Sequence, residues 1–175
     1  MRYQAIYDEY RLLLSDQSEN LKILSTLSDG YISKKRISGK HYFYLQKKVD
    51  GKMISEYIRE ELLPQVESEL QKRAVLADAL AQTDKKLNNL EAATKMLDTS
   101  LYRQLIVLRR CSLMDSLPVE ERKKSLAFGN AMTALEGIPA SENTEKSLAL
   151  WVSGQQSFKD GYLQALRSHN LVEAW

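Results

Sequence analysis

Cysteine, histidine, glycine and proline are all scarce in this 175-residue chain. Cys111 is the only cysteine, so the chain can form no internal disulfide and offers no cysteine-based metal site. Two preceding arginines would lower its pKa, but a packed cysteine on an amphipathic helix is the favoured interpretation. The histidines, His41 and His169, lie far apart without ligand-like neighbours, so we expect no metal ion and no other cofactor. Seven glycines and three prolines favour regular structure over long loops.

Membrane-spanning, secretory and catalytic signatures are missing as well. No run approaches the roughly 18 apolar residues of a membrane span, and the N-terminal segment MRYQAIYDEYRLLL lacks the apolar core of a signal peptide. The composition, 43% hydrophobic and 27% charged with a net charge of +2, is that of a soluble globular protein. We therefore expect a cytoplasmic protein without membrane contact. Because no glycine-rich phosphate loop, GxSxG elbow or HExxH pair occurs, we also expect that it is not an enzyme.

Hydrophobic spacing predicts a mainly α fold that includes a small sheet. Apolar residues three to four apart predict one helix, or two short ones, over residues 3–27. Residues 31–58 are instead rich in Tyr, Ile and Phe, and they are divided by the turn dipeptides Ser38-Gly39 and Asp50-Gly51. This pattern predicts a three-stranded antiparallel β-meander. Its middle strand alternates in character, so that one face can pack on a helix.

Residues 60–101 predict one long helix, with Pro64 tolerated in its first turn. Leucines and two threonines recur at steps of four and three and form a coiled-coil-like seam: Leu76, Leu80, Thr83, Leu87, Leu90, Thr94, Leu97 and Leu101. Such a seam must be buried against another helix. Two kinds of partner satisfy this requirement equally well. One is a second copy of the chain, which would form a homodimer, and the other is a helix of the same chain, at 102–115 or at the N-terminus.

The remaining residues, 102–175, predict four short helices. Ser141 is a natural N-cap for the third of them, and Gly154 can close it. We expect two domains. The first, 1–115, holds the N-terminal helix, the meander and the long helix, and the second, 116–175, is a C-terminal helical module.

The predicted meander concentrates positive charge. Within residues 31–59, eight lysines and arginines stand against Asp50 and Glu56, which gives a net charge of +6. A small sheet that carries cations and tyrosines can lie on a phosphate backbone. The candidate nucleic-acid-binding residues are Lys34, Lys35, Arg36, Lys40, Lys47 and Lys48. The alternative is that the lysines protect exposed strand edges against aggregation.

Glu136 stands at the predicted end of a helix, where a negative charge is normally unfavourable. Residues 125–166 around it resemble the small antitoxins of the VbhA type, which inhibit Fic-domain adenylyl-transferases. The resemblance rests on an alanine-rich helix ending in Leu-Glu-Gly, a link that contains Pro139 and Ser141, and a helix that ends in an aromatic-Val-x-Gly segment at Gly154. Residues 28–100 loosely resemble an uncharacterised prokaryotic family with a meander and a long helix, to which no chemistry is attached.

The family's inhibitory motif is Ser or Thr, three further residues, Glu, and then Gly or Asn. In this chain Glu136 and Gly137 fit the motif, Met132 stands at the Ser/Thr position, and Thr133 follows one residue late. The departure at Met132 concerns a small hydrogen-bonding contact near the nucleotide and leaves the carboxylate in place.

The resemblance implies an antitoxin that binds a Fic-domain toxin protein in trans and sets Glu136 against the arginine that holds the ATP phosphates. The partner-binding residues would be the apolar Phe128, Leu135, Leu148 and Trp151. A carboxylate paired with that arginine would occupy the place of the γ-phosphate and leave ATP misplaced for reaction. The alternative is a non-enzymatic nucleic-acid-binding or coiled-coil adaptor protein in which Glu136 is incidental.

Overall fold

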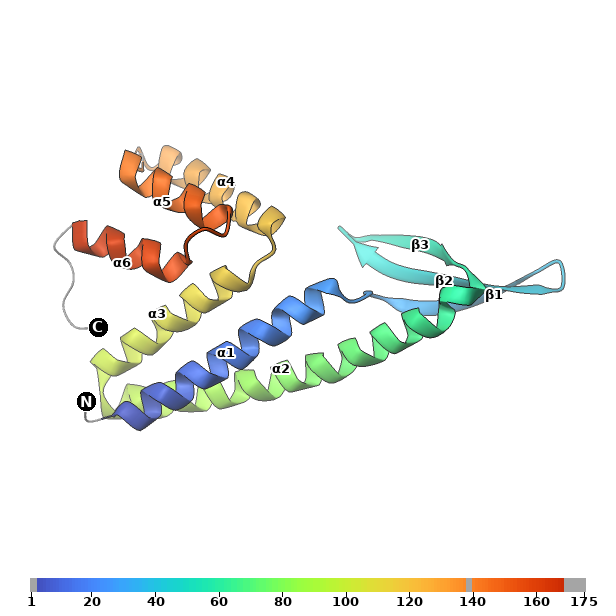
Figure 1. Cartoon of the computed structure of the whole chain (residues 1–175), viewed down its shortest axis with the longest axis horizontal. Coiled ribbons are helices and arrows are strands. Elements are labelled where there is room, and N and C mark those ends of the chain that lie inside the picture. Colours follow the sequence, from blue (N-terminus) through green and yellow to red (C-terminus); the bar gives the residue numbers. More distant parts are fainter. Residues whose placement is uncertain (1–2, 138–139, 169–175) are drawn as a thin grey trace. The chain divides into compact units, whose positions relative to one another are not determined.

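The computed structural model describes residues 3–137 and 140–168, and the described chain is 72% helical (Figure 1). This confirms the predicted mainly α fold with a three-stranded antiparallel meander. The elements, in chain order, are α1 (Gln4–Thr26), β1 (Tyr31–Ile37), β2 (Lys40–Val49), β3 (Lys52–Ile58), a 3-10 turn (Glu60–Leu62), α2 (Leu63–Leu97), α3 (Thr99–Ser116), α4 (Val119–Leu135), α5 (Glu142–Val152) and α6 (Phe158–Ser168). Pro139 and His169 lie outside the described residues.

The contacts divide the chain into two compact units. One contains the described residues up to Lys22 together with those from Thr83 onward, and the other contains Ile23–Gln82. The sheet therefore belongs to the second unit and helices α3 to α6 to the first, while α1 and α2 contribute to both. These units group the residues differently from the expected boundary at residue 115, and that boundary stays a prediction.

The core of the first unit lies where α1, α2 and α3 pack together (Figure 1). Its buried members are Tyr10, Leu14, Leu87, Leu101, Leu105 and Leu108. Leu87, from the predicted seam of the long helix, is 0% exposed there. At this position the seam is thus buried by helices of the same chain, which was one of the two alternatives. The homodimer stays a prediction.

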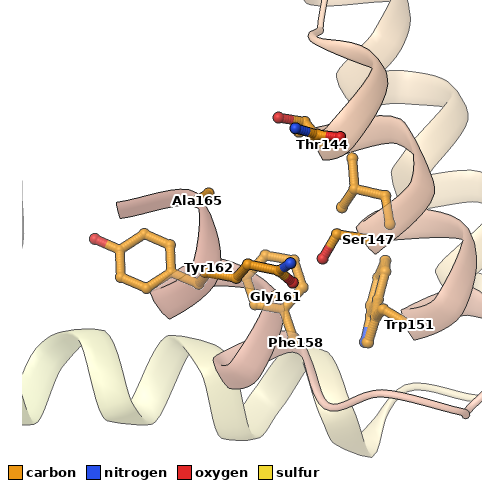
Figure 2. A pocket seen from close by; sticks show the side chains of 10 residues that line it. Thr144, Ser147, Trp151, Phe158, Gly161, Tyr162 and Ala165 are labelled. Carbon is orange, nitrogen blue, oxygen red and sulfur yellow. The ribbon is translucent and has the colours of Figure 1, made fainter. Parts of the chain in front are cut away.

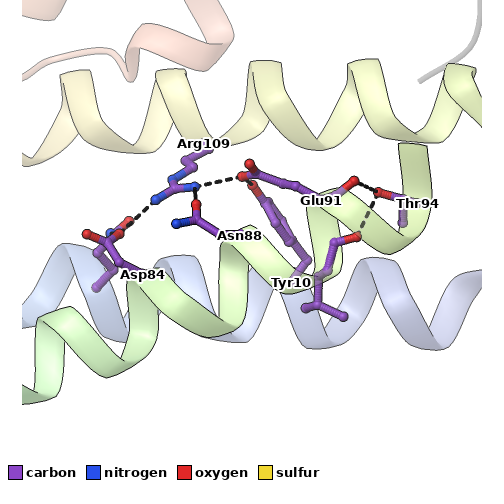
Figure 3. A network of polar contacts seen from close by, with 8 residues as sticks. Tyr10, Asp84, Asn88, Glu91, Thr94 and Arg109 are labelled. Carbon is purple, nitrogen blue, oxygen red and sulfur yellow. Dashed lines mark hydrogen bonds and ion pairs between the residues drawn. The ribbon is translucent and has the colours of Figure 1, made fainter. Parts of the chain in front are cut away.

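A polar network centred on Arg109 joins the same three helices (Figure 3). From α3, its guanidinium donates to Asp84 Oδ1 at 2.7 Å, Asn88 Oδ1 at 2.7 Å and Glu91 Oε1 at 2.8 Å, all on α2. From α1, the hydroxyl of Tyr10 donates to Glu91 Oε1 at 2.5 Å. Burial, followed by the neighbouring Glu91 carboxylate, raises the pKa of Tyr10, so this phenol remains a hydrogen-bond donor.

The long helix ends earlier than the sequence pattern indicated. Its predicted end at residue 101 is wrong by four residues, because α2 stops at Leu97 and a new helix begins at Thr99. Asp98 causes the break: its backbone is extended and its side chain accepts hydrogen bonds from the N–H groups of Ser100 and Leu101. Pro64 lies in the first turn as predicted, because it is the second residue of α2, while α2 itself begins at Leu63, after the 3-10 turn that starts at Glu60.

The sheet has the order β1-β2-β3, and its hairpins close on the two predicted dipeptides. Ser38 and Gly39 have φ values of 50° and 81°, and Asp50 and Gly51 have values of 49° and 80°. Positive φ at both central residues defines the type I′ turn, whose twist matches that of the flanking strands. The two-residue loops therefore fix the register of all three strands.

Candidate protein-binding and nucleic-acid-binding sites

The end of α4 holds the predicted inhibitory motif. Glu136 is the C-cap residue, and its N–H donates to Met132 O at 3.1 Å. Gly137 follows with φ of 71° and donates to Ala134 O at 3.2 Å, which closes the helix in the left-handed conformation that glycine favours. The Glu136 side chain is exposed. Its carboxylate is therefore displayed at a helix end that attracts cations.

An apolar face on α4 leads to this carboxylate. Phe128, Met132 and Leu135 follow one another at steps of four and three, which places them on one side of the helix. Phe128 is 70% exposed and Leu135 is 83% exposed. None of the seventeen residues of α4, all of which the structure describes, is buried. Exposed aromatic and aliphatic side chains gathered on one face are typical of a surface that binds another protein.

Thr133 lies beside this apolar face and is half-buried. Its hydroxyl donates to Asn130 O at 3.1 Å, within its own helix. The hydroxyl proton is thus used within the helix itself. Met132, at the position where the antitoxin family has Ser or Thr, presents an exposed apolar side chain.

The other two predicted partner-binding residues, on α5, are less accessible. Trp151 is only 2% exposed, and its ring meets that of Phe158 on α6 edge-on at 5.1 Å (Figure 2). Leu148 is half-buried and lines a cavity of about 200 Å³ between α5 and α6. In this arrangement Trp151 supports the helical module from inside, and Phe128 and Leu135 are the members of the predicted set that lie on the surface.

Arg122 holds this module together, and the sequence did not single it out. Its guanidinium donates to the carbonyl oxygens of Asp115 at 2.6 Å, Leu117 at 2.9 Å and Trp151 at 2.8 Å. These bonds connect the start of α4 with the end of α3 and the end of α5. The helix that carries Glu136 is therefore anchored at the end opposite to that carboxylate.

The register of the sheet sorts its side chains onto two faces. Residues paired directly across strands share a face, so Tyr44 of β2 lies between Ser33 of β1 and Tyr57 of β3. We call this side of the sheet the tyrosine face. Its members are Tyr31, Ser33, Lys35, Ile37, Lys40, Tyr42, Tyr44, Gln46, Lys48, Met53, Ser55 and Tyr57.

The six basic residues predicted to contact nucleic acid are divided equally between the two faces. Lys35, Lys40 and Lys48 lie on the tyrosine face. The others, Lys34, Arg36 and Lys47, lie on the opposite face, which also carries Phe43 and the buried Ile58. The sheet thus brings together half of the predicted set and combines that half with four tyrosines.

Cys111 is buried on α3. Burial, followed by the nearby Asp115 carboxylate, raises the pKa of its thiol to about 11. The two arginines that precede it in sequence do not make it acidic. The favoured interpretation of a packed cysteine agrees with this environment.

We therefore expect slow thiol modification of the native protein. At pH 8 a group with this pKa holds about a hundredfold less thiolate than an ordinary cysteine, so a disulfide reagent should label Cys111 slowly in buffer and rapidly in guanidinium chloride. Because the folded state favours the protonated thiol, Cys111 contributes to the free energy of unfolding. This contribution is present below about pH 9 and is lost as the pH rises toward 11. Fast labelling of the folded chain would contradict the packed environment.

Comparison with known proteins finds one partial match, to a domain of unknown function, and no chemistry. A family model described as a domain of unknown function (DUF6788) matches residues 3–68. The match covers α1, the sheet and the beginning of α2, less than half of the chain. It overlaps the meander region for which an uncharacterised family was expected, and it includes α1 while leaving out most of α2. No curated protein and no solved structure shows a match to the chain.

Among the described helices, none combines the length and the apolar character needed to cross a membrane. Within residues 3–137 and 140–168, no three His, Cys, Asp or Glu side chains gather in a way that would hold a metal ion.

Proposed function

We propose that the chain is an antitoxin that binds a Fic-type adenylyl-transferase in trans and inhibits it with Glu136. One observation carries this proposal: an exposed carboxylate stands at the C-terminal end of α4, directly after an exposed apolar face on the same helix. The resemblance of residues 125–166 to VbhA-type antitoxins supplies the class of partner. The nucleic-acid-binding alternative rests on a different surface, the sheet.

Electrostatics favours a cationic partner for Glu136. The helix dipole makes the C-terminal end of α4 negative, so the additional carboxylate is unfavourable in the isolated chain. An arginine that binds ATP phosphates would relieve this repulsion and form a charge-assisted pair with the carboxylate. ATP would then lose its γ-phosphate contact, and a displacement of about 1 Å at the reacting phosphate can cost about a hundredfold in rate.

Binding and inhibition are expected to rest on different residues. Phe128 and Leu135 would bury apolar surface in the partner, and buried aromatic and aliphatic anchors dominate interface energies. The Glu136 carboxylate would contribute the inhibitory charge. Because the hydroxyl of Thr133 is bonded within α4, inhibition in this chain would not depend on a hydroxyl group at the motif.

We expect Glu136→Gln and Glu136→Gly to lose inhibition while the complex still forms. The Gln variant retains the shape of the side chain and removes its charge, so inhibition should fall by about a hundredfold. The measurement is adenylylation by a Fic-domain enzyme encoded in the same genome, with labelled ATP and each variant, beside the dissociation constant of the complex. Glu120→Gln is the matched control, because it removes an exposed carboxylate from the opposite end of α4.

Two further variants separate the contribution of apolar binding from that of the inhibitory motif. Leu135→Ala should weaken the complex, and at saturating concentration it should still inhibit. Met132→Ser restores the residue that the family pattern contains, so at saturating concentration it should inhibit at least as well as the natural chain, while the loss of its apolar side chain should weaken the complex. If Glu136→Gln inhibits as strongly as the natural chain, the carboxylate mechanism is wrong and any inhibition is steric. If no complex forms with the natural chain, the proposed function is wrong.

A further inference from the structure

The sheet carries a second surface that fits a different class of partner. We propose that the tyrosine face binds single-stranded nucleic acid, with bases stacked on its tyrosine rings and phosphates held by its lysines. This function is additional to the proposed inhibition of a Fic enzyme, because it uses residues of the second compact unit and none of α4.

The distribution of charge on the sheet supports a polyanionic partner. Lys35, Lys40 and Lys48 project from the tyrosine face, and all three are exposed. Within the strands Tyr31–Ile37, Lys40–Val49 and Lys52–Ile58, which the structure describes in full, this face has no carboxylate, since Glu56 lies opposite. One side of a small sheet is therefore purely cationic, although the net charge of the whole chain is only +2.

The aromatic rings form a cluster that a base can contact. The Tyr57 ring lies 5.7 Å from that of Tyr44 and 6.2 Å from that of Tyr42, measured between centroids. The ammonium group of Lys35 lies 4.8 Å from the centroid of the Tyr44 ring. Tyr57 and, on β1, Tyr31 are exposed. Exposed rings next to lysines are the combination with which proteins hold single strands, because every base offers a π-face and every nucleotide a phosphate.

Protection of strand edges does not account for this arrangement. Edge protection requires charge on the outer strands, which accounts for Lys35 on β1, whereas Lys40 and Lys48 belong to β2, the middle strand. It also places no requirement on tyrosines, and a solvated sheet face is ordinarily polar. The gathering of four tyrosines on the face without a carboxylate is the feature that a binding function explains.

The chemistry of the face favours single strands over duplexes. Bases in a duplex are stacked on one another and present only their edges, whereas bases of a single strand expose their π-faces to a protein. The tyrosine face offers four aromatic rings for such stacking, and among the bidentate edge readers Arg, Asn and Gln it has only Gln46, while Arg36 lies on the opposite face. Tyrosines offer stacking without edge readout, so we expect binding with little sequence preference.

The test is fluorescence anisotropy of the full chain with labelled oligothymidine, oligouridine and a mixed-sequence duplex of equal length, at about 50 mM salt and at several higher concentrations. We expect both single strands to bind more tightly than the duplex, and the oligothymidine and oligouridine arms show whether the ribose 2′-hydroxyl matters. Tyr44→Ala should weaken binding by about 5- to 150-fold, and Tyr44→Phe, which retains the ring, should bind like the natural chain.

A pair of charge-matched double variants tests the face itself. Replacing Lys35 and Lys48 with Gln should reduce the slope of log affinity against log salt by about 1.4, because two phosphate contacts are lost. Replacing Lys34 and Lys47 with Gln removes the same charge from the opposite face and should leave the slope nearly unchanged. Equal effects of the two pairs, a preference for the duplex, or no binding by the natural chain at about 50 mM salt would each overturn the proposal. Far-ultraviolet circular dichroism of each variant verifies the fold.

Discussion

Leu87→Asp is expected to unfold the α1–α2–α3 core, and Leu87→Ala to lower the free energy of unfolding by about 2–5 kcal/mol. Leu87 is 0% exposed and packs among buried side chains of α1 and α3. Truncation to alanine removes three carbon atoms from this core and leaves a cavity. An aspartate at the same position would bury a charge without a partner, which costs more than a cavity.

Urea unfolding followed by circular dichroism measures the effect, and Leu97→Ala is the matched control. Leu97 belongs to the same predicted seam, but it is 60% exposed at the end of α2, so its loss should cost less than about 0.5 kcal/mol. A cost at Leu97 as large as that at Leu87 would indicate that a second copy of the chain buries the seam. Sedimentation of the natural chain would then have to show a dimer.

Arg109→Ala is expected to lower the free energy of unfolding by about 3 kcal/mol. The substitution leaves the carboxylates of Asp84 and Glu91 without the guanidinium that bonds to both. Removing one member of a partly buried ion pair is costly because the remaining charge has lost its partner. We take the lower end of the usual range because Asp84 remains partly solvated at 49% side-chain exposure.

Arg110→Ala is the control for Arg109, because Arg110 is the next residue of α3 and its side chain is exposed. It should change the free energy of unfolding by less than about 0.5 kcal/mol. A double-mutant cycle with Glu91→Gln gives a sharper test. If Arg109 and Glu91 stabilise the fold through one another, the double variant should cost less than the sum of the single variants, by about 0.5–3 kcal/mol. Additive effects would contradict the network.

Local signals in the sequence predicted most of the elements and missed one boundary. The dipeptides Ser38-Gly39 and Asp50-Gly51 indicated two hairpins because a type I′ turn needs residues that tolerate positive φ. The end of α2 was missed because the spacing of leucines continues through it to Leu101. The signal that should have been used was Asp98 followed by Thr and Ser, since an aspartate is among the best N-caps and begins a new helix.

The candidate sites were only partly predictable. The positive charge of the meander could be counted from the sequence. Its division between two faces depends on the strand register, which could have been derived from the two-residue turns but was not. The burial of Trp151 could not be inferred, since an aromatic residue on an amphipathic helix suits a core or an interface equally. Arg109 could not be selected among 25 lysines and arginines, because its partners Asp84 and Glu91 lie on another helix, 25 and 18 residues away in sequence.

The distance along the chain between Tyr10 and Glu91, 81 residues, constrains the order in which the molecule can be assembled. During synthesis α1 is made first, yet its buried side chains have no partners until α2 is nearly complete and α3 has followed. The strands of the meander pair with their immediate neighbours and can form without α1. The first helix therefore leaves the ribosome as an amphipathic segment with its apolar stripe in water. Until Leu105 and Leu108 have been made, that stripe is exposed apolar surface of the kind that makes incompletely folded chains prone to aggregation.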